Sequence, residues 1–284
     1  MSHEEPQLLL NDLIFPEGPR WHDGRLWFSD MHAHEVVAVD ESGRRETIVT
    51  LENSPSGLGW LPDGRLLIVS MEDRRLLRRE HDGRLVVHAD LSELAPFHLN
   101  DMVVDSHGNA YVGNFGFDLH GGAKLRDTCL VLVRPDGHAS VVADDMLFPN
   151  GSVVTPDGGT LIVAESFGKR LTAFDIRYDG TLAGRRVWAN LDVHPDGIAL
   201  DEEGCVWLAN PIAPGGFLRV KEGGEVVDRI DMPQHAGYAC ALGGADRKTL
   251  FLLEAVDSSP HKNPQRGNGW IRKTRVDVAG AGIP

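Results

Sequence analysis

Short apolar runs alternate with polar turns along the chain, and the same arrangement returns several times. Each copy consists of a small or polar residue, an apolar run, a turn such as Asp-Gly, and a second apolar run. The second runs are short and rich in β-branched or aromatic residues, as at residues 66–70 and 206–210. This pattern is typical of β-hairpins rather than of helices.

The spacing of these copies indicates one repeated structural unit. A glycine follows each of the first five starts after 6 or 7 residues. A period of roughly 40 to 50 residues around one constant hairpin is typical of four-stranded propeller blades. We therefore predict an all-β protein, a six-bladed β-propeller with blades of four antiparallel strands. The starts are 39, 44, 50, 46 and 42 residues apart when the copies are aligned on Gly18, Gly57, Asp101, Gly151, Gly197 and Ala239.

The two ends of the chain are expected to close this ring. Residues 7–13 have the pattern of a strand that precedes the first repeat, and residues 270–278 alternate as an outer strand does. Pairing of the N-terminal strand with the last blade removes exposed sheet edges. Residues 1–6 are expected to form a flexible tail. Because no linker composition interrupts the repeats, residues 1–284 are predicted to form a single domain.

Charge and composition then narrow the possible partners and the compartment. The formal net charge is −14 at pH 7, which argues against nucleic acid or an anionic membrane as partner. The apolar runs are far shorter than the roughly 20 residues of a membrane helix. Cys129, Cys205 and Cys240 are odd in number and follow no metal-site spacing, and no apolar leader is evident. We therefore expect a cytoplasmic protein, a monomer or weak homo-oligomer.

One position at the start of each repeat carries an oxygen atom in its side chain. Equivalent positions of successive blades are related by rotation about the axis, so they form a ring around one channel mouth. Oxygen ligands without sulfur favour Ca²⁺, followed by Mg²⁺ or Mn²⁺, whereas Zn²⁺ usually prefers nitrogen or sulfur. A divalent ion held by Glu17, Asn150 and Asp196 is therefore our hypothesis. The full ring is Glu17, Ser56, Asn100, Asn150, Asp196 and Tyr238.

The same tripeptides have an alternative, purely structural interpretation. Asn-Gly, Asp-Gly and Pro-X-Gly are ordinary turn sequences, in which Asn or Asp often bonds only its own backbone. Three such tripeptides in one register favour a site over three unrelated turns. The Asp-Gly turns at Asp23, Asp63 and Asp157 lie 6 or 7 residues beyond the ring position and are assigned no function.

Four motifs together resemble the senescence-marker-protein/gluconolactonase/LRE family of regucalcin-like sugar lactonases. They are Pro16-Glu17-Gly18-Pro19, Asn100-Asp101, Pro149-Asn150-Gly151 and Pro195-Asp196-Gly197, and the similarity runs from about Phe15 to Glu254. The resemblance implies a six-bladed propeller with one axial divalent ion held by Glu17, Asn150 and Asp196. It also implies substrate contact from Asn100 and hydrolysis of a lactone.

Two features depart from the pattern that this resemblance implies. His98 stands where sugar-lactone members often have an arginine, two residues before Asn100. The glycine-rich loop at residues 116–126 does not resemble the acidic stretch found there, and it could be a mobile lid or a solvated loop. Both departures weaken the expectation of an aldonolactone substrate.

The chemistry we expect is metal-assisted ester hydrolysis. The ion would polarise the lactone carbonyl, Asp196 would act as general base for water, and Asn100 and His98 would contact the substrate. The chain contains no Gly-x-Ser-x-Gly motif of a serine hydrolase. The alternatives are a non-catalytic ligand- or protein-binding propeller, another metal-dependent hydrolase acting on aryl or phosphoester bonds, and a lyase on the same scaffold.

Overall fold

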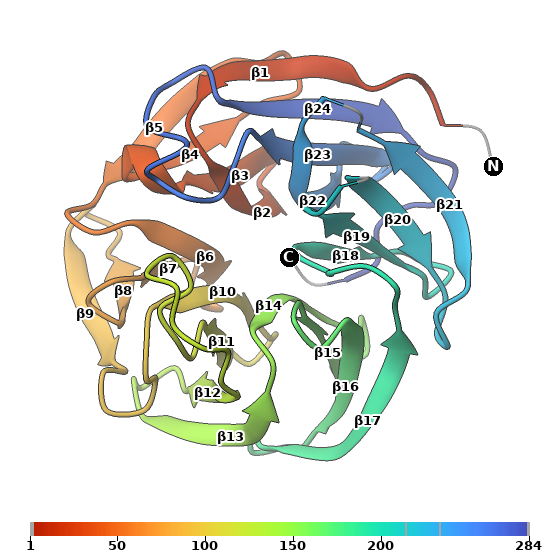
Figure 1. The fold of residues 1–284 in the computed structure, drawn as a ribbon. Coiled ribbons are helices and arrows are strands. Elements are labelled where there is room, and N and C mark those ends of the chain that lie inside the picture. The colour runs from red at the N-terminus through yellow and green to blue at the C-terminus, as the bar shows by residue number, and fades with distance from the viewer. Residues whose placement is uncertain (1–2, 214, 233, 283–284) are drawn as a thin grey trace.

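The computed structural model describes residues 3–213, 215–232 and 234–282 of the chain. Its strands form six four-stranded sheets arranged as blades around a central axis (Figure 1). The predicted six-bladed β-propeller is therefore confirmed. Of the expected N-terminal tail, residues 1 and 2 lie outside the described residues, and residues 3–6 precede the first strand. That residues 1–284 form a single domain stays a prediction. Among the described residues, none of the helices has the length and apolar character to cross a membrane.

Blades 1 to 5 each consist of four consecutive antiparallel strands, the first nearest the axis (Figure 1). Blade 1 comprises β2 (Pro16–His22), β3 (Arg25–Asp30), β4 (Glu35–Val39) and β5 (Arg45–Thr50), with a 3₁₀ turn at Met31–Ala33. Blade 2 comprises β6 (Pro55–Trp60), β7 (Leu66–Ser70), β8 (Arg75–Arg79) and β9 (Leu85–Asp90). Blade 3 comprises β10 (Leu99–Val104), β11 (Ala110–Asn114), β12 (Thr128–Val133) and β13 (Ala139–Met146).

The remaining blades continue this order around the ring. Blade 4 comprises β14 (Pro149–Val154), β15 (Thr160–Glu165), β16 (Arg170–Ile176) and β17 (Leu182–Asn190). Blade 5 comprises β18 (Ile198–Leu200), β19 (Val206–Asn210), β20 (Gly216–Val220) and β21 (Val226–Asp231). Blade 6 comprises β22 (Ala236–Gly243), β23 (Thr249–Ala255), β24 (Gly269–Arg275) and, from the other end of the chain, β1 (Gln7–Leu13).

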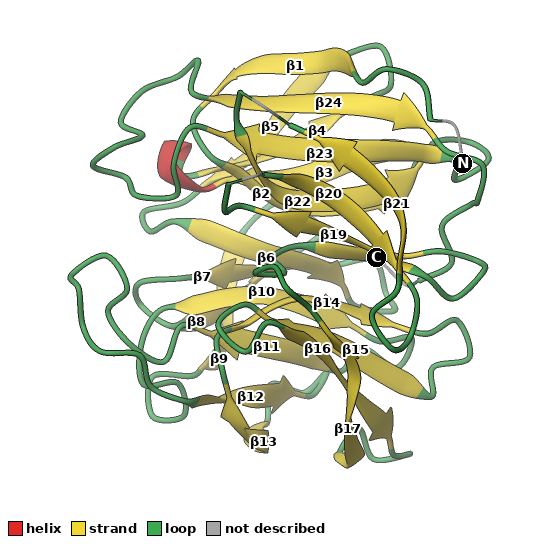
Figure 2. Cartoon of the chain, turned by 45° about the vertical axis from the view of Figure 1, so that its right-hand side comes forward, coloured by secondary structure: helices red, strands yellow, loops and turns green. Residues whose placement is uncertain are grey.

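The N-terminal strand closes the ring as predicted. Figure 2 shows β1 beside β24, and the pairing is antiparallel, with Gln7 opposite Lys273. The strand expected at residues 270–278 is β24, which ends at Arg275 and is the third strand of blade 6, between β23 and β1. It lies in the outer half of the blade, as expected, but residues 276–278 do not continue it. Val276 leaves the ladder, and its N–H donates instead to the carbonyl of Lys248 at 3.0 Å.

The hydrophobic core lies between neighbouring blades. Leu26 and Phe28 of blade 1 pack in one cluster with Phe251 and Leu253 of blade 6 and with Leu13 of β1. All five side chains are fully buried. Because burial of apolar surface is the main stabilising term, each blade depends on its two neighbours, and closure by β1 completes the last interface.

In four of the six repeats the inner strands approach one another so closely that the residue after the ring position, a glycine, has no room for a Cβ atom. A Cβ built on Gly18, Gly57, Gly151 or Gly197 would lie 2.3 to 2.8 Å from a backbone atom of the following blade. Three of these glycines lie within strands β2, β6 and β14, and Gly197 directly precedes β18, so they are not turn glycines. The glycines of the Pro-X-Gly motifs therefore lie where neighbouring blades contact each other around the axis.

Carboxylates at the ends of second strands fix the segments that lead into the inner strands. Asp30 accepts hydrogen bonds from the N–H groups of Ile14 at 3.1 Å and Phe15 at 2.8 Å. Glu165 accepts from the N–H of Leu147 at 2.8 Å. Burial raises the pKa of Asp30. Burial also acts to raise the pKa of Glu165, but hydrogen bonds from Arg170, Thr172 and Leu147 outweigh it, so the pKa of Glu165 is lowered. These bonds hold the chain two to three residues before the ring.

The close approach of the inner strands can be tested at Gly151. We expect Gly151→Ala to lower the free energy of unfolding by about 2 kcal/mol or more, because its Cβ would lie 2.6 Å from the Cα of Gly197. Urea unfolding followed by circular dichroism measures this. Gly159→Ala is the matched control, since its Cβ would meet only the flexible carboxylate of Asp157 at 3.3 Å. Equal stability of the two variants would contradict the blade-contact account.

Candidate metal centre

The six ring positions lie at the axial ends of the inner strands. Five of them are within strands β2, β6, β10, β14 and β22, and Asp196 stands two residues before β18. All six side chains are buried. Burial raises the pKa of the Tyr238 hydroxyl, and the negative charges of Asp196 and Glu17 raise it further. These side chains from blades 1, 5 and 6 therefore lie around one centre. The structure thus brings the predicted ring residues into one buried zone.

The carboxylates of this zone are desolvated and close to one another. Burial, followed by repulsion from Asp196, raises the pKa of Glu17 well above its usual range, although its Oε2 accepts the N–H of Gly18 at 2.7 Å. Burial, followed by the charge of Asp101, raises the pKa of Asp196 to about 8, while the Asn150 amide opposes this. Such shifts indicate that the negative charges lack sufficient compensation from the protein.

Arg20 supplies the cationic side chain that acts on these carboxylates. Its Nη2 contacts Asp101 Oδ1 at 2.7 Å and also donates to the carbonyl of Met102, so it reaches from blade 1 to blade 3. Burial still raises the pKa of Asp101, against the opposing effect of Arg20. Asp101 stands where the other repeats carry glycine or alanine, which is the sequence signal that distinguishes this position.

The charges and the donor set fit a divalent cation. Three buried carboxylates, on Glu17, Asp101 and Asp196, interact with one another. The Arg20 guanidinium acts on Asp101 and Glu17 and, among the described residues, is not one of the groups that act on Asp196. Together these four groups carry a charge of −2 when all are ionised. Asp196 Oδ1 is buried without a hydrogen-bond partner. Within the described ranges, no three His, Cys, Asp or Glu side chains are arranged to hold a metal ion, so the candidate set needs the amide of Asn150. Carboxylate and amide oxygens are ligands that Ca²⁺ accepts.

Hydrogen bonds orient the two ring amides. Asn150 Nδ2 donates to Ser166 Oγ at 3.2 Å, and Ser166 Oγ donates to the carbonyl of Pro195 at 2.7 Å. Asn100 Nδ2 donates to the carbonyl of Pro149 at 3.2 Å. Because the NH₂ groups are engaged, the Oδ1 atoms remain as the acceptor ends. Ser166 therefore links Asn150 to the residue before Asp196, and our sequence analysis assigned it no role.

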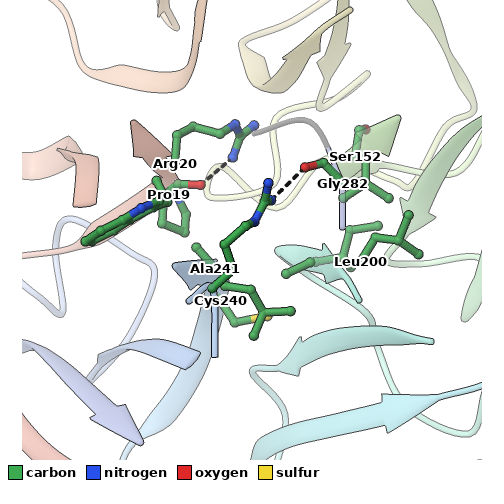
Figure 3. A pocket seen from close by; sticks show the side chains of 13 residues that line it. Pro19, Arg20, Ser152, Leu200, Cys240, Ala241 and Gly282 are labelled. Atoms are coloured by element: carbon green, nitrogen blue, oxygen red, sulfur yellow. Dashed lines mark hydrogen bonds between the residues drawn. The ribbon is translucent and has the colours of Figure 1, made fainter. Parts of the chain in front are cut away.

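A small cavity continues the axis beyond the ring. It has a volume of about 40 Å³, and Arg20, Ser152, Leu200 and Cys240 from four different blades converge on it (Figure 3). Gly282 also lines it and accepts a bond from Arg247 Nη2 at 2.9 Å. The C-terminal segment thus contributes to the wall of this cavity.

The two features singled out beside the ring lie at the same end of the blades. The His98 ring stacks on Phe97 with centroids 4.1 Å apart, and burial lowers its pKa. In the loop of residues 115–127, Phe115 and Phe117 are buried, whereas residues 120–127 are exposed. The loop is therefore anchored at its start and solvated beyond it, and motion as a lid stays a prediction.

Comparisons with known proteins agree with these observations. Residues 15–256 match the model of the SMP-30/Gluconolactonase/LRE-like region. The chain is 28% identical over 283 residues to 6-deoxy-6-sulfogluconolactonase of Pseudomonas putida, covering 95% of this chain and 94% of that protein. It is 26% identical to regucalcin of Xenopus laevis, covering 93% and 92%. The crystal structure of a calcium-binding protein, regucalcin, from Agrobacterium tumefaciens shares the fold, with a TM-score of 0.80, 23% identity, and coverage of 99% and 96%.

The role of Ser166 in orienting Asn150 can be tested by metal titration. We expect Ser166→Ala to weaken divalent-ion affinity about tenfold or more, as is typical when a group that orients a ligand is removed. Isothermal titration with Ca²⁺ measures the dissociation constant. Ser42→Ala, which removes an exposed hydroxyl bonded to Asp40, serves as the control. Unchanged affinity in Ser166→Ala would show that this hydroxyl does not position a ligand.

Proposed function

Because the chain belongs to the SMP-30/Gluconolactonase/LRE-like family, we propose that it is a metal-dependent lactone hydrolase. The observation that carries the proposal is the buried axial centre. The three carboxylates of Glu17, Asp101 and Asp196 carry more negative charge than the Arg20 guanidinium compensates. In addition, the buried Asp196 Oδ1 has no hydrogen-bond partner. The relative from Pseudomonas putida, named as a sulfogluconolactonase, supports the reaction class. The substrate proposed is a small lactone, either sugar-derived or of another kind.

The proposed cofactor is one divalent ion held by Glu17, Asn150 and Asp196. When bound, it supplies polarisation of the lactone carbonyl and compensation of the charge that develops on the carbonyl oxygen. We favour Ca²⁺, with Mg²⁺, Mn²⁺ and Zn²⁺ as alternatives, because all donors are oxygen atoms. The calcium-binding regucalcin that shares this fold supports the choice.

Asp196 is the proposed general base. Its free Oδ1 accepts a proton from the attacking water, whose oxygen bonds to the carbonyl carbon. The ring C–O bond then breaks, and the departing alkoxide takes up a proton to give the open hydroxy acid. Since Asp196 is fixed by its backbone, with its N–H donating to the carbonyl of Ala209 at 3.0 Å, the base keeps its orientation through the reaction.

Asn100 and His98 are the proposed substrate contacts. With its Nδ2 held by Pro149, Asn100 presents its Oδ1 to a hydroxyl or ring substituent of the substrate. His98 lies two residues earlier at the entrance of the same strand, and its ring is partly exposed. Asn100 would bind and orient the lactone, and His98 is also the proposed donor of the proton that the departing alkoxide takes up.

The remaining proposals concern partners and compartment. Cys129, Cys205 and Cys240 are free and buried, which supports a reducing, cytoplasmic location. The net charge of −14 supports a small molecule rather than nucleic acid or a membrane as partner. We propose a monomer or a weak homo-oligomer.

Removal of the metal should abolish catalysis. We expect chelator-stripped protein to release no acid from a panel of γ- and δ-lactones in a pH-stat. Restoring Ca²⁺, Mg²⁺, Mn²⁺ or Zn²⁺ one at a time should bring activity back with at least one ion. Absence of acid release with every ion, in protein that retains a tightly bound metal, would overturn the lactonase proposal.

The base assignment predicts a specific loss in Asp196→Asn. We expect kcat to fall about 10²- to 10⁴-fold in the metal-loaded variant, which is the usual contribution of a positioned base. Asp157→Asn is the matched control, because it makes the same change in an exposed aspartate of an Asp-Gly hairpin turn, away from the ring position. Full activity of Asp196→Asn with metal bound would mean that another group activates the water.

A further inference from the structure

Aromatic rings gather at the axial end where the metal centre lies. The positions two residues before the ring of oxygen side chains include Phe15, His98, Phe148 and His194. These four residues lie in the connections that lead into the inner strands, at the end of the blades where the ring lies. The T-shaped contact of Phe15 with Tyr238, with centroids 4.8 Å apart, joins them directly to the ring of oxygen side chains.

The rings form a continuous arc from blade 3 to blade 5. Phe115 lies 6.1 Å from His98 and 4.6 Å from Phe148, as measured between ring centroids. Phe148 meets Phe167 at 5.1 Å and a right angle, and Phe167 meets His194 at 6.0 Å. We call this group the aromatic collar, and define it as Phe15, His98, Phe115, Phe148, Phe167 and His194.

The collar is attached to the metal centre through short connections. Phe148 is two residues from Asn150, and its carbonyl accepts the N–H of Ser166 at 3.1 Å. His194 is two residues from Asp196, and its Nδ1 contacts the carbonyl of Ser166 at 3.1 Å. These connections place Phe148 and His194 next to the proposed ligand Asn150 and the proposed base Asp196.

The backbone at Phe148 gives a second, independent observation. Its φ is +62°, in the left-handed region that bulky side chains rarely adopt. Glycine or asparagine would fit this conformation with less strain, yet a phenyl ring occupies it. Strained conformations of this kind cluster at ligand sites, because the surrounding structure holds them in place.

The collar differs in exposure around the arc. Phe115 and Phe148 are 8% and 6% exposed, so they form its buried support. His98, Phe167 and His194 are only partly buried and present surface to the entrance. Phe167 stands between the buried and the exposed members, next to Ser166, and is the ring best placed to touch a substrate.

We propose that the aromatic collar selects lactones with an apolar aryl or alkyl substituent over polyhydroxylated sugar lactones. This inference rests on the proposed lactonase function and names its substrate class. Ring faces favour flat or apolar groups, whereas each hydroxyl of a sugar lactone buried against them loses its bonds to water. Selectivity against the polar substrate then follows from unpaired hydroxyl groups.

Two probes of the same ring size test this selectivity. Dihydrocoumarin is an aryl δ-lactone, and glucono-δ-lactone is a polyhydroxylated one. We compare kcat/KM of the metal-loaded protein, each divided by the uncatalysed rate constant of that lactone. The expected ratio favours dihydrocoumarin at least tenfold. An equal or larger value for gluconolactone overturns the selectivity and leaves the lactonase proposal standing, whereas no hydrolysis of either probe with any ion overturns both.

A matched pair of variants assigns the selectivity to the collar. We expect Phe167→Gln to lower kcat/KM for dihydrocoumarin about tenfold, with no loss for gluconolactone. Trp60→Gln is the control, because Trp60 is also partly buried in an aromatic group, stacked on His22 at 3.9 Å, but lies at the opposite end of its inner strand. An equal loss for both substrates in Phe167→Gln overturns the assignment.

Binding of the ring-opened products provides a readout that does not depend on turnover or on variants. Isothermal titration of the metal-loaded wild-type protein compares 3-(2-hydroxyphenyl)propanoate with gluconate. We expect the aryl acid to bind at least tenfold more tightly. Tighter binding of gluconate overturns the proposal.

Discussion

The close approach of the inner strands around the axis is the constraint on which the rest of this structure depends. Gly18, Gly57, Gly151 and Gly197 each face the backbone of the next blade at a distance that excludes a Cβ atom. Each inner strand can then lie against its neighbour, and the side chain just before the glycine is directed into the narrow centre. The close approach of the inner strands therefore determines both how the ring closes and where the side chains of the site lie.

This closeness also determines the electrostatics of the centre. Burial raises the pKa values of Glu17 and Asp196, and neighbouring carboxylates raise them further: Asp196 and Asp101 act on Glu17, and Asp101 acts on Asp196. The Arg20 guanidinium is already engaged by Asp101. Such an arrangement is costly for the protein alone, and the proposed divalent cation would balance it. If the cation is bound as proposed, the same buried charges would couple the stability of the ring to the affinity for the ion.

Outside the ring of oxygen-bearing side chains lie the aromatic side chains of the collar. Ser166 is the point of contact between the two, since its hydroxyl holds Asn150 while its backbone contacts Phe148 and His194. The carboxylates of Asp30 and Glu165 secure the chain that leads into this layer. The layer nearest the axis carries the proposed ion site, and the collar, which lies outside it, carries the proposed selection of the substrate.

The repeat made the fold predictable from sequence, because the copies share one hairpin, and four of them share a glycine after the ring position. Pairing of the N-terminal strand with the C-terminal strands of the last blade was also predicted and is confirmed. Rotational symmetry sufficed to propose that Glu17, Asn150 and Asp196 meet, and their role as ligands stays a proposal. Only the tertiary structure joined Arg20 to Asp101 across the axis and Ser166 to Asn150. Such contacts depend on how the blades are rotated relative to one another, which no local pattern of residues encodes.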